Sequence, residues 1–394
     1  MKITVPTIDF GTSKIVTMVA QSNGERCDIV GSGAVPYSGY LQDGWNNPDE
    51  IRDVIRTAID QAQKTGNCRI HELNVGVPGM FTRVIVKEVH VSLTGPDPHV
   101  TAQEVRACFK LAEESGGDRI IHSAPAWFRV DDGKKTLSPV GIKGRELSAM
   151  IALVTADKYF IDDITYRLRD MDIEPREFYS TVAGEATYAL SQDERDKTAM
   201  LIDIGYLCTD VMVMEGDALI FHKCLDIGGG HISADIAEQL NIPFPFVEEK
   251  IKQTYSFNST NQDETYVIPA TEDEPARTVR RDEVTPIIEA KVEEIAEAIN
   301  KALEEGGVKL GKWSNVYLTG GGLILNKGGK DFLAGKLHRI IREAQRTNNK
   351  MTSHVFSSAV GLTILVVTTQ EEQKAPEGGA KGLFSRAFRW LMGY

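Results

Sequence analysis

The chain has 394 residues, of which 42% are hydrophobic and 25% are charged, and its formal net charge is −12. This length allows two domains with sizeable cores, and the composition is that of a folded soluble protein. Because a surface that binds nucleic acid needs a positive field, the negative charge argues against nucleic acid as the main partner. The longest apolar run, residues 360–367, is too short to span a bilayer.

The cysteines are odd in number and widely scattered: Cys27, Cys68, Cys108, Cys208 and Cys224. Without paired metal-ligand spacing, they predict neither a disulfide framework nor a zinc site. A reducing cytoplasm fits this usage best. The N-terminus also lacks the basic lead and apolar core of a secretion signal. We therefore expect a cytoplasmic protein.

Two stretches share one pattern, in which an apolar run, an aspartate, a tight turn and a second apolar run follow each other. The first covers residues 3–19 with Asp9 at the bend, and the second covers residues 200–213 with Asp203. Each predicts a β-hairpin with a carboxylate at its turn, and the repetition indicates a duplicated fold. If the halves face each other, both turns converge on one cleft that would suit nucleotide phosphates and a divalent cation.

The first hairpin is followed by a predicted strand over residues 28–34, a helix that begins after Asn47-Pro48-Asp49, and a buried strand over residues 73–78. The pattern then changes between residues 83 and 163, where a small inserted domain is expected. Its predicted elements are a strand over residues 84–91, a helix over residues 101–115 that opens with a capping box, and strands over residues 119–130 and 147–154.

The second half of the chain returns to the alternation of helices and strands. Its predicted elements are helices over residues 159–171 and 180–190, the second hairpin, a strand over residues 218–226, a helix after residues 228–230, a long amphipathic helix over residues 282–305 and a buried strand over residues 316–319. Residues 258–281 are polar, and we expect them to form an irregular, exposed edge.

The turn of the first hairpin has residue types that suit a phosphate. Gly11 lets backbone N–H groups approach phosphate oxygens, Thr12 and Ser13 add hydroxyl donors, and Lys14 adds a positive charge. Asp9 would hold Mg²⁺ through water, as that cation prefers. The alternative interpretation is a plain β-hairpin turn.

Three further features together support a nucleotide site. Gly320, Gly321 and Gly322 follow a buried strand and offer close backbone approach to a purine. Glu249 and Lys252, three residues apart on a helical face, could grip a ribose. Residues 182–185 and 359–362 each predict a small-residue helix that crosses between the halves. Taken singly, each feature has an alternative interpretation. These are, in the same order, a helix cap, a surface ion pair and close helix packing.

In this order and spacing, the features resemble the actin-type ATPase superfamily, whose two phosphate loops, two connecting helices and adenosine loop match these places. The stretch over residues 121–147, with Ile121-His122-Ser123-Ala124-Pro125 at its start, looks like the inserted subdomain of the FtsA family of bacterial cell-division proteins. Residues 226–237 are similar to that family's segment after the second phosphate loop.

This resemblance implies an α/β, actin-like two-lobed duplicated fold with an FtsA-type inserted α+β subdomain and a C-terminal amphipathic helix. The implied boundaries are residues 1–82 and 164–198 for lobe 1, 83–163 for the inserted subdomain, 199–240 and 301–354 for lobe 2, 241–300 for its outer subdomain, 355–369 for a connecting helix back to lobe 1, 370–381 for a linker and 382–394 for a membrane-targeting helix.

The resemblance also implies a function. The family consists of cytoplasmic proteins that bind ATP and Mg²⁺, form filaments and tether FtsZ polymers to the cell membrane at the division site. The FtsZ C-terminal tail would bind residues 241–300, and other division proteins would bind residues 83–163. The implied site residues are Asp9 and Asp203 for metal, Gly11, Thr12, Ser13, Lys14 and Gly205 for phosphate, Glu249, Lys252, Gly320, Gly321 and Gly322 for nucleoside, and Glu185 for orienting water or, alternatively, as a solvated helix charge.

The chain departs from the family in the second phosphate loop, which usually carries glycines. Tyr206, Leu207 and Cys208 occupy those places. A Cβ at Leu207 restricts the backbone dihedrals and the approach to a phosphate. We therefore expect a nucleotide-binding structural protein that is at most a slow ATPase. Cys208 is expected to be a packing residue, since no neighbour in sequence would activate its thiol.

The last residues have the pattern of a helix that lies in a membrane surface. Residues 370–381 have linker composition, and an apolar face and flanking cations follow. The residues expected to meet an anionic membrane are Leu383, Phe384, Arg386, Phe388, Arg389, Trp390 and Leu391. The alternative is a terminal helix docked on the protein's own core, and the charged linker argues against it.

Two other classes stay open. One is an ATP-binding pilus-assembly protein of the PilM type, which shares the plan of the inserted domain but for which the amphipathic tail is unexpected. The other is a small-molecule kinase on the actin fold, for which the sequence offers no recognisable second-substrate site.

Overall fold

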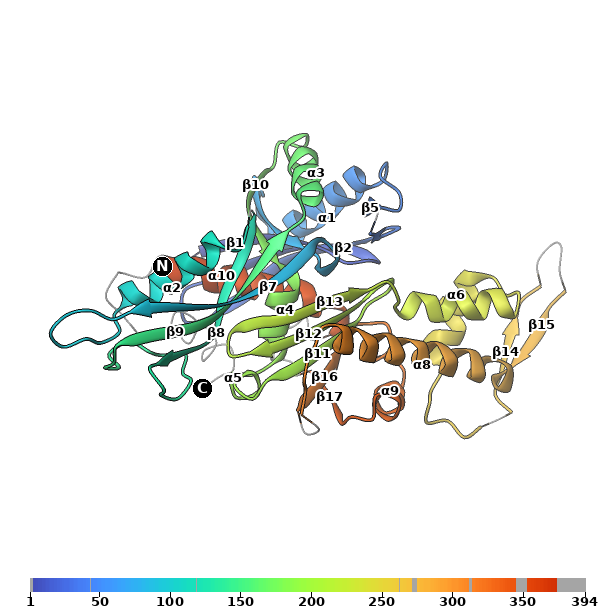
Figure 1. Ribbon diagram of the computed structural model, residues 1–394. Coiled ribbons are helices and arrows are strands. Elements are labelled where there is room, and N and C mark those ends of the chain that lie inside the picture. Colours follow the sequence, from blue (N-terminus) through green and yellow to red (C-terminus); the bar gives the residue numbers. More distant parts are fainter. Residues whose placement is uncertain are drawn as a thin grey trace. The chain divides into compact units, whose positions relative to one another are not determined.

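The computed structural model of the chain describes residues 3–42, 44–117, 119–261, 263–270, 275–311, 314–344 and 353–373. Groups of strands are separated by helices along the chain, in agreement with the expected α/β class (Figure 1). The chain divides into two compact units. Unit 1 consists of Met1–Leu201, Met212–His222 and Gln345–Tyr394, and unit 2 consists of Ile202–Val211 and Lys223–Ala344.

The first sheet of unit 1 has the strand order β10-β6-β1-β2-β3. Its strands are β10 (Glu174–Ser180), β6 (Glu72–Val77), β1 (Ile3–Phe10), β2 (Lys14–Ser22) and β3 (Cys27–Pro36). β1, β2 and β3 form the predicted antiparallel hairpin and its third strand, whereas β6 runs parallel to β1 and β10 runs parallel to β6. Parallel pairing needs crossover connections, which helices supply here.

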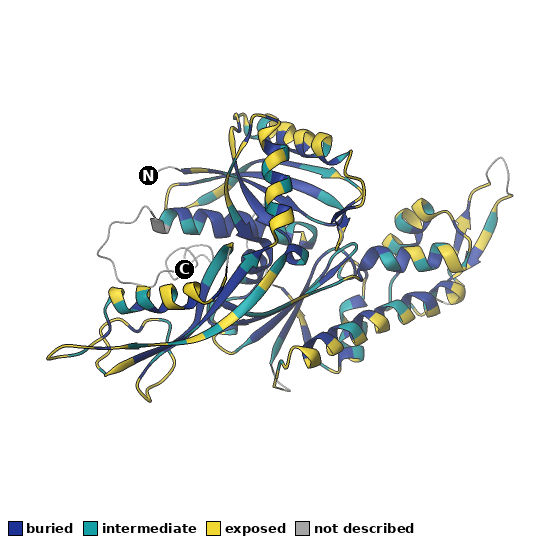
Figure 2. Cartoon of the chain, turned by 45° about the horizontal axis from the view of Figure 1, so that its top comes forward, coloured by how far each residue is buried: buried dark blue, intermediate teal, exposed yellow. Residues whose placement is uncertain are grey.

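The alternation of side chains along β1 assigns its two faces. Ile8 and Phe10 lie in one core with α1 (Ile51–Gly66) and α3 (Lys158–Arg169). Ile3 and Val5 lie in another with α10 (Ser357–Gln373), which packs against α4 (Thr181–Ala189) and is buried along most of its length (Figure 2). Because successive residues of a strand point to opposite faces, Asp9 faces α10 together with Val5.

The inserted part of unit 1 has a sheet of its own. β7 (Thr82–Ser92), β9 (Glu146–Ala156) and β8 (Ile120–Val130) form an antiparallel sheet in the order β7-β9-β8. Helix α2 (Ala102–Glu114) packs on it and starts at Thr101, whose hydroxyl accepts from the Gln103 N–H. The Glu104 carboxylate accepts from the Thr101 N–H at 2.8 Å, so the predicted capping box is confirmed.

A second five-stranded sheet has the order β13-β12-β11-β16-β17. Its strands are β13 (Ala218–Leu225), β12 (Thr209–Glu215), β11 (Ala199–Ile204), β16 (Asn315–Thr319) and β17 (Ile341–Glu343). The helical elements of unit 2 are α6 (Gly229–Gln239), α7 (Phe244–Phe246), the π-helical η2 (Val247–Lys252), α8 (Arg281–Glu305) and α9 (Gly329–Leu337). α8 packs against α6 and α9.

The described chain also contains several short elements. They are β4 (Tyr40–Leu41), β5 (Gly44–Trp45), the 3₁₀ turns η1 (Gly79–Phe81) and η3 (His354–Phe356), and α5 (Gln192–Arg195). In the part of the chain that the structure describes, no helix is both long and apolar enough to cross a membrane. The tail residues predicted to bind a membrane, 382–394, lie outside the described residues.

The sequence prediction was wrong for residues 258–281, which contain a hairpin rather than only irregular chain. β14 (Thr265–Ile268) pairs antiparallel with β15 (Arg277–Arg280). In these two strands only Tyr266, Ile268 and Val279 are buried. Since each strand is only 4 residues long, the alternation was too short to be recognised within a polar stretch.

Candidate functional site

Two hydrogen bonds from one tyrosine hold the turn of the first hairpin. The N–H of Gly11 donates to the Lys14 carbonyl at 3.1 Å and closes the turn. Tyr37 donates its hydroxyl to the Gly11 carbonyl at 2.7 Å and its N–H to the Ser13 carbonyl at 3.2 Å. Two carbonyl oxygens of the turn are therefore hydrogen-bonded to Tyr37, which fixes the position of the turn relative to the residue that follows β3.

Asp9 precedes this turn and is almost fully buried, with 5% of its surface exposed. Its carboxylate accepts a hydrogen bond from Ser358 Oγ at 3.1 Å, at the start of α10. Burial raises the pKa of Asp9 to about 6, although the Ser358 hydroxyl and the charge of Lys14 act in the opposite direction. A desolvated carboxyl group gains from a bound cation, because the cation stabilises the ionised form. Asp9 is therefore suited to a metal.

The two small-residue segments predicted as crossing helices belong to α4 and α10 and touch at their glycines. A Cβ at Gly184 would lie 2.9 Å from the Gly361 carbonyl oxygen, and a Cβ at Gly361 would lie 2.5 Å from the Glu185 Cα. Close helix packing, the alternative noted above, is therefore present here. Glu185 itself is buried, with 2% exposed, so the alternative of a solvated helix charge is wrong for it.

In unit 2, the turn after β11 is bound to the start of α6. The N–H of Gly205 closes the turn on the Cys208 carbonyl at 2.9 Å. The amides of Gly229 and Gly230 donate to the carbonyls of Gly205 and Tyr206 at 2.9 and 2.7 Å. The first two amides of α6 are therefore hydrogen-bonded to carbonyls of the turn, and in this conformation they are not directed at a phosphate.

The glycine run after β16 also packs against this turn. Gly320 has a φ of +87°, and a Cβ there would lie 2.0 Å from Asp203 Oδ1. A Cβ at Gly322 would lie 2.3 Å from the Gly205 carbonyl oxygen, and the Gly322 N–H donates to Ile204 at 2.7 Å. Only glycine allows this approach, so the structure brings together Asp203, Gly205 and the glycine run, as the sequence hypothesis requires.

Lys252 extends from η2 toward the same place. Its Nζ donates to the Gly229 carbonyl at 2.7 Å, lies 3.4 Å from a Glu248 carboxylate oxygen and stands 5.7 Å from the centre of the Tyr206 ring. Burial lowers the pKa of Lys252, and Glu248 opposes that shift. Glu249, the predicted companion, is exposed. Both i, i+3 and i, i+4 pairs meet on a helix, so the sequence could not select Glu248.

The remaining predicted residues lie on the turns. Thr12 is buried, Ser13 and Lys14 are partly exposed, and the Lys14 Nζ lies 5.3 Å from the centre of the Phe356 ring. Sequence reasoning missed Tyr37 and Ser358. Ser358 directly precedes the crossing motif of α10 and could have been found from that position, whereas Tyr37 follows β3 with no signal of its own.

The donor set fits Mg²⁺ and phosphate in chemical type. Asp9 in unit 1 and Asp203 in unit 2 offer carboxylate oxygens, which a hard cation prefers. Thr12 and Ser13 offer hydroxyl donors within the first turn. In the second turn, the amides at the start of α6 are already hydrogen-bonded to the turn. The first turn therefore has the better donor set for an anion.

Comparison with known proteins supports the resemblance inferred from the motifs. The family model described as cell division protein FtsA matches residues 200–361. A curated protein named cell division protein FtsA, from Pseudomonas aeruginosa, is 24% identical over 98% of this chain and 97% of its own length. The protein of the same name from Bacillus subtilis is 25% identical over 76% of this chain and 70% of its own length.

Solved structures agree at the level of the fold. A chain of the PilM–PilN type IV pilus biogenesis complex aligns with a TM-score of 0.61 at 18% identity, covering 93% of this chain and 99% of that chain. MreB5 of Spiroplasma citri bound to ADP aligns with a TM-score of 0.55 at 12% identity, covering 95% and 99%. The predicted actin-like fold is thereby confirmed, and the chain is similar over nearly its whole length to a protein named cell division protein FtsA.

Proposed function

We propose that this protein is an actin-like cell-division protein that binds Mg–ATP, polymerises, and anchors FtsZ filaments to the cytoplasmic face of the cell membrane at the division site. The observation that carries the nucleotide part is the convergence of Asp203, Gly205 and the glycine run, where a Cβ at Gly320 would collide with Asp203 and a Cβ at Gly322 with Gly205. Sequence relatives named as FtsA support the cell-division part.

In this proposal Asp9 and Asp203 hold Mg²⁺, and the turn over residues 11–14 binds phosphate with its backbone amides, hydroxyls and lysine. The cation would neutralise phosphate charge. Lys252 and the glycine run would hold the nucleoside, with Glu249 at the rim. Glu185 would orient a water molecule, and the side chain of Leu207 would keep hydrolysis slow.

Calorimetry tests the nucleotide site. Wild-type protein titrated with Mg–ATP should release heat, and Asp203→Ala should weaken binding at least about tenfold, since it removes a metal carboxylate. Asp331→Ala is a matched control, because Asp331 is an exposed aspartate of unit 2 on α9 and should leave binding unchanged. A wild type that shows no heat, and no protection from thermal unfolding by Mg–ATP, would exclude the proposed nucleotide site.

The membrane and polymer parts are tested on lipid. Removal of residues 382–394 should abolish co-sedimentation with anionic liposomes, and Phe388→Glu or Trp390→Glu should do nearly the same, since a charge on the apolar face is costly there. Undiminished binding would contradict the proposal. Electron microscopy on a lipid monolayer should show filaments only when ATP is present. An FtsZ tail peptide should bind the part formed by residues 241–300.

A second candidate is a pilus-assembly role of the PilM kind. It is favoured by the fold likeness to a chain of the PilM–PilN complex, which covers nearly all of both chains. Paired peptide titrations distinguish the two, with an FtsZ tail peptide in one and a peptide from a PilN-type partner in the other. Binding of only the second peptide would favour the pilus role. Phosphoryl transfer to a small substrate would indicate a kinase instead.

A further inference from the structure

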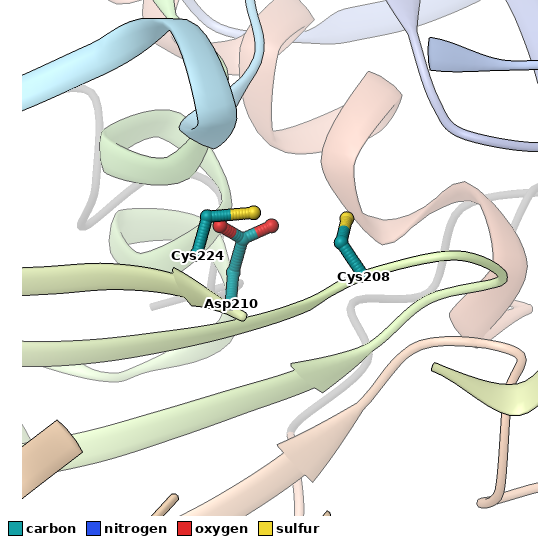
Figure 3. Close-up of side chains that lie close together, drawn as sticks. All are labelled: Cys208, Asp210 and Cys224. Carbon is teal, nitrogen blue, oxygen red and sulfur yellow. The ribbon is translucent and has the colours of Figure 1, made fainter. Parts of the chain in front are cut away.

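Three side chains that can bind a metal lie together beside the second turn. They are Cys208, Asp210 and Cys224, and their ligand atoms all lie within 4.8 Å of one another (Figure 3). Cys208 and Asp210 are two residues apart, so along an extended chain they point to the same face. Cys224 belongs to β13, which is the neighbour of β12 in the sheet. Because Cys208 lies in the turn before β12 and Cys224 lies in β13, the spacing of the two cysteines in the sequence did not indicate their proximity.

The electrostatics of this group favour a cation. Cys208 is buried, and the other two are partly buried. Two thiolates and a carboxylate this close cannot all be ionised unless a positive charge compensates them.

We propose that Cys208, Asp210 and Cys224 form a site for a thiophilic divalent cation of the Zn²⁺ type, with two sulfur ligands, one carboxylate oxygen and a fourth position open to water. Zn²⁺ binds sulfur at about 2.3 Å and carboxylate oxygen at about 2.0–2.2 Å in tetrahedral geometry, which places ligand atoms roughly 3.5–3.8 Å apart. The ligand atoms lie within 4.8 Å of one another, so their separations need to shorten by about 1 Å at most to reach that spacing. A disulfide would need the two sulfurs at about 2.0 Å.

The ligand types select the cation. Soft thiolates prefer Zn²⁺ and similar metals, whereas Mg²⁺ prefers oxygen ligands. The site is therefore distinct from the proposed Mg²⁺ site at Asp203. Binding at neutral pH displaces the protons of both thiols, so two protons pass to the buffer for each cation bound.

A cation here would brace the second turn. The backbone carbonyl of Cys208 accepts the Gly205 N–H that closes the turn. Thr209 Oγ1 donates to the Ile227 carbonyl at 2.7 Å, just before α6. A Cβ at Gly228 would lie 2.9 Å from the Cys208 nitrogen, so the turn and the start of α6 are already in close contact. A link from Cys208 to β13 would fix this arrangement. Its consequence for nucleotide rests on the proposed function, but the cation site itself does not.

The test uses the full-length chain, reduced with a phosphine, stripped with a chelator and kept free of nucleotide. Titration with Zn²⁺ against a chromophoric chelator should give about one equivalent bound. Co²⁺ should give the near-ultraviolet charge-transfer absorption of a thiolate-bound metal. Cys208→Ser and Cys224→Ser should each weaken binding more than about 100-fold, and Asp210→Asn about tenfold, since even indirect ligand support is worth 10- to 100-fold. Cys68→Ser, at a partly buried cysteine of unit 1, should change nothing.

Several results would overturn the proposal. One is the absence of stoichiometric Zn²⁺ binding by wild-type protein whose circular dichroism shows it folded. Another is binding that all three variants leave intact. A third is a Cys208–Cys224 disulfide that forms with glutathione disulfide, found by peptide mapping, in protein that gives no Co²⁺ absorption. Because no nucleotide is used, failure here and failure of ATP calorimetry are separate outcomes.

Discussion

The two hairpin turns share a sequence pattern but are supported in different ways. The first turn, residues 11–13, is tied back by Tyr37, and its aspartate is buried against Ser358 of α10. The second turn, residues 205–208, is enclosed by backbone from α6 and from the glycine run after β16. The comparison shows that an Asp-x-Gly turn acquires its properties from segments distant in sequence. The first turn should therefore be sensitive to pH, and the second to any added Cβ.

The largest expected effect is at Gly320. Gly320→Ala places a Cβ 2.0 Å from Asp203 Oδ1 at a φ of +87°, where an L side chain is already strained. We expect the free energy of unfolding to fall by about 3–5 kcal/mol, measured by urea denaturation. The corresponding change in the first turn, Gly11→Ala, meets only the Lys14 carbonyl oxygen at 3.2 Å and should cost about 1 kcal/mol or less.

Gly335→Ala is the matched control for both changes. Gly335 lies in α9, and a Cβ there meets no atom within 4 Å. Because alanine is the better helix former, the variant should be more stable by about 0.5–1 kcal/mol. Equal losses for Gly11→Ala and Gly320→Ala would mean that the two turns are packed alike, which contradicts the comparison.

The next effect concerns the pH dependence of the first turn. Burial raises the pKa of Asp9 from 3.8 to about 6. Between about pH 4 and pH 6 the folded state therefore holds more protons than the unfolded state, and this group makes stability fall as the pH rises. Asp9→Asn removes that loss. We therefore compare the free energy of unfolding of the variant with that of wild type at each pH, measured by urea denaturation. This difference should shift in favour of the variant by up to about 3 kcal/mol between pH 4 and pH 7.

Magnesium provides the control for this second prediction. If Asp9 takes part in holding Mg²⁺, saturating Mg–ATP should stabilise wild type more than Asp9→Asn at pH 7, since only the wild type offers the carboxylate. An equal shift of both melting temperatures would remove Asp9 from the metal site. A flat difference between wild type and variant from pH 4 to pH 7 would show that Asp9 titrates normally.

The sequence predicted most of the elements, because apolar periodicity is local. The hairpin at Asp9, the capping box at Thr101 and the long helix α8 all follow from residues close together in the chain. The supports of the site could not be predicted in this way. Tyr37 and the Cys208–Cys224 proximity depend on which segments become neighbours in the fold. Ser358 differs, because it directly precedes the crossing motif of α10 and could have been found from that position. Glu248 was missed because two helical spacings competed.

A smaller effect is expected at Lys252, whose ammonium group joins η2 to the second turn. Lys252→Met keeps the apolar stem but loses the hydrogen bond to the Gly229 carbonyl, which should cost about 1–2 kcal/mol of stability. Lys250→Met, in the same π-helical segment at an exposed position, should stay within about 0.5 kcal/mol. Equal effects in thermal denaturation would show that Lys252 does not support the turn.

The smallest effect asks whether the second turn limits nucleotide binding. Leu207→Gly removes the Cβ that restricts phosphate approach, at the place where the family usually has glycine. We expect a Kd for Mg–ATP about 3- to 10-fold lower, a gain of about 1 kcal/mol, against a loss of roughly 0.5–1 kcal/mol in folding stability. Leu207→Ala keeps the Cβ and shortens the side chain. If alanine strengthens binding as much as glycine does, side-chain bulk rather than backbone freedom sets the limit. If neither strengthens it, the amides of Gly229 and Gly230, already bound to the turn, are the better explanation for weak phosphate binding there.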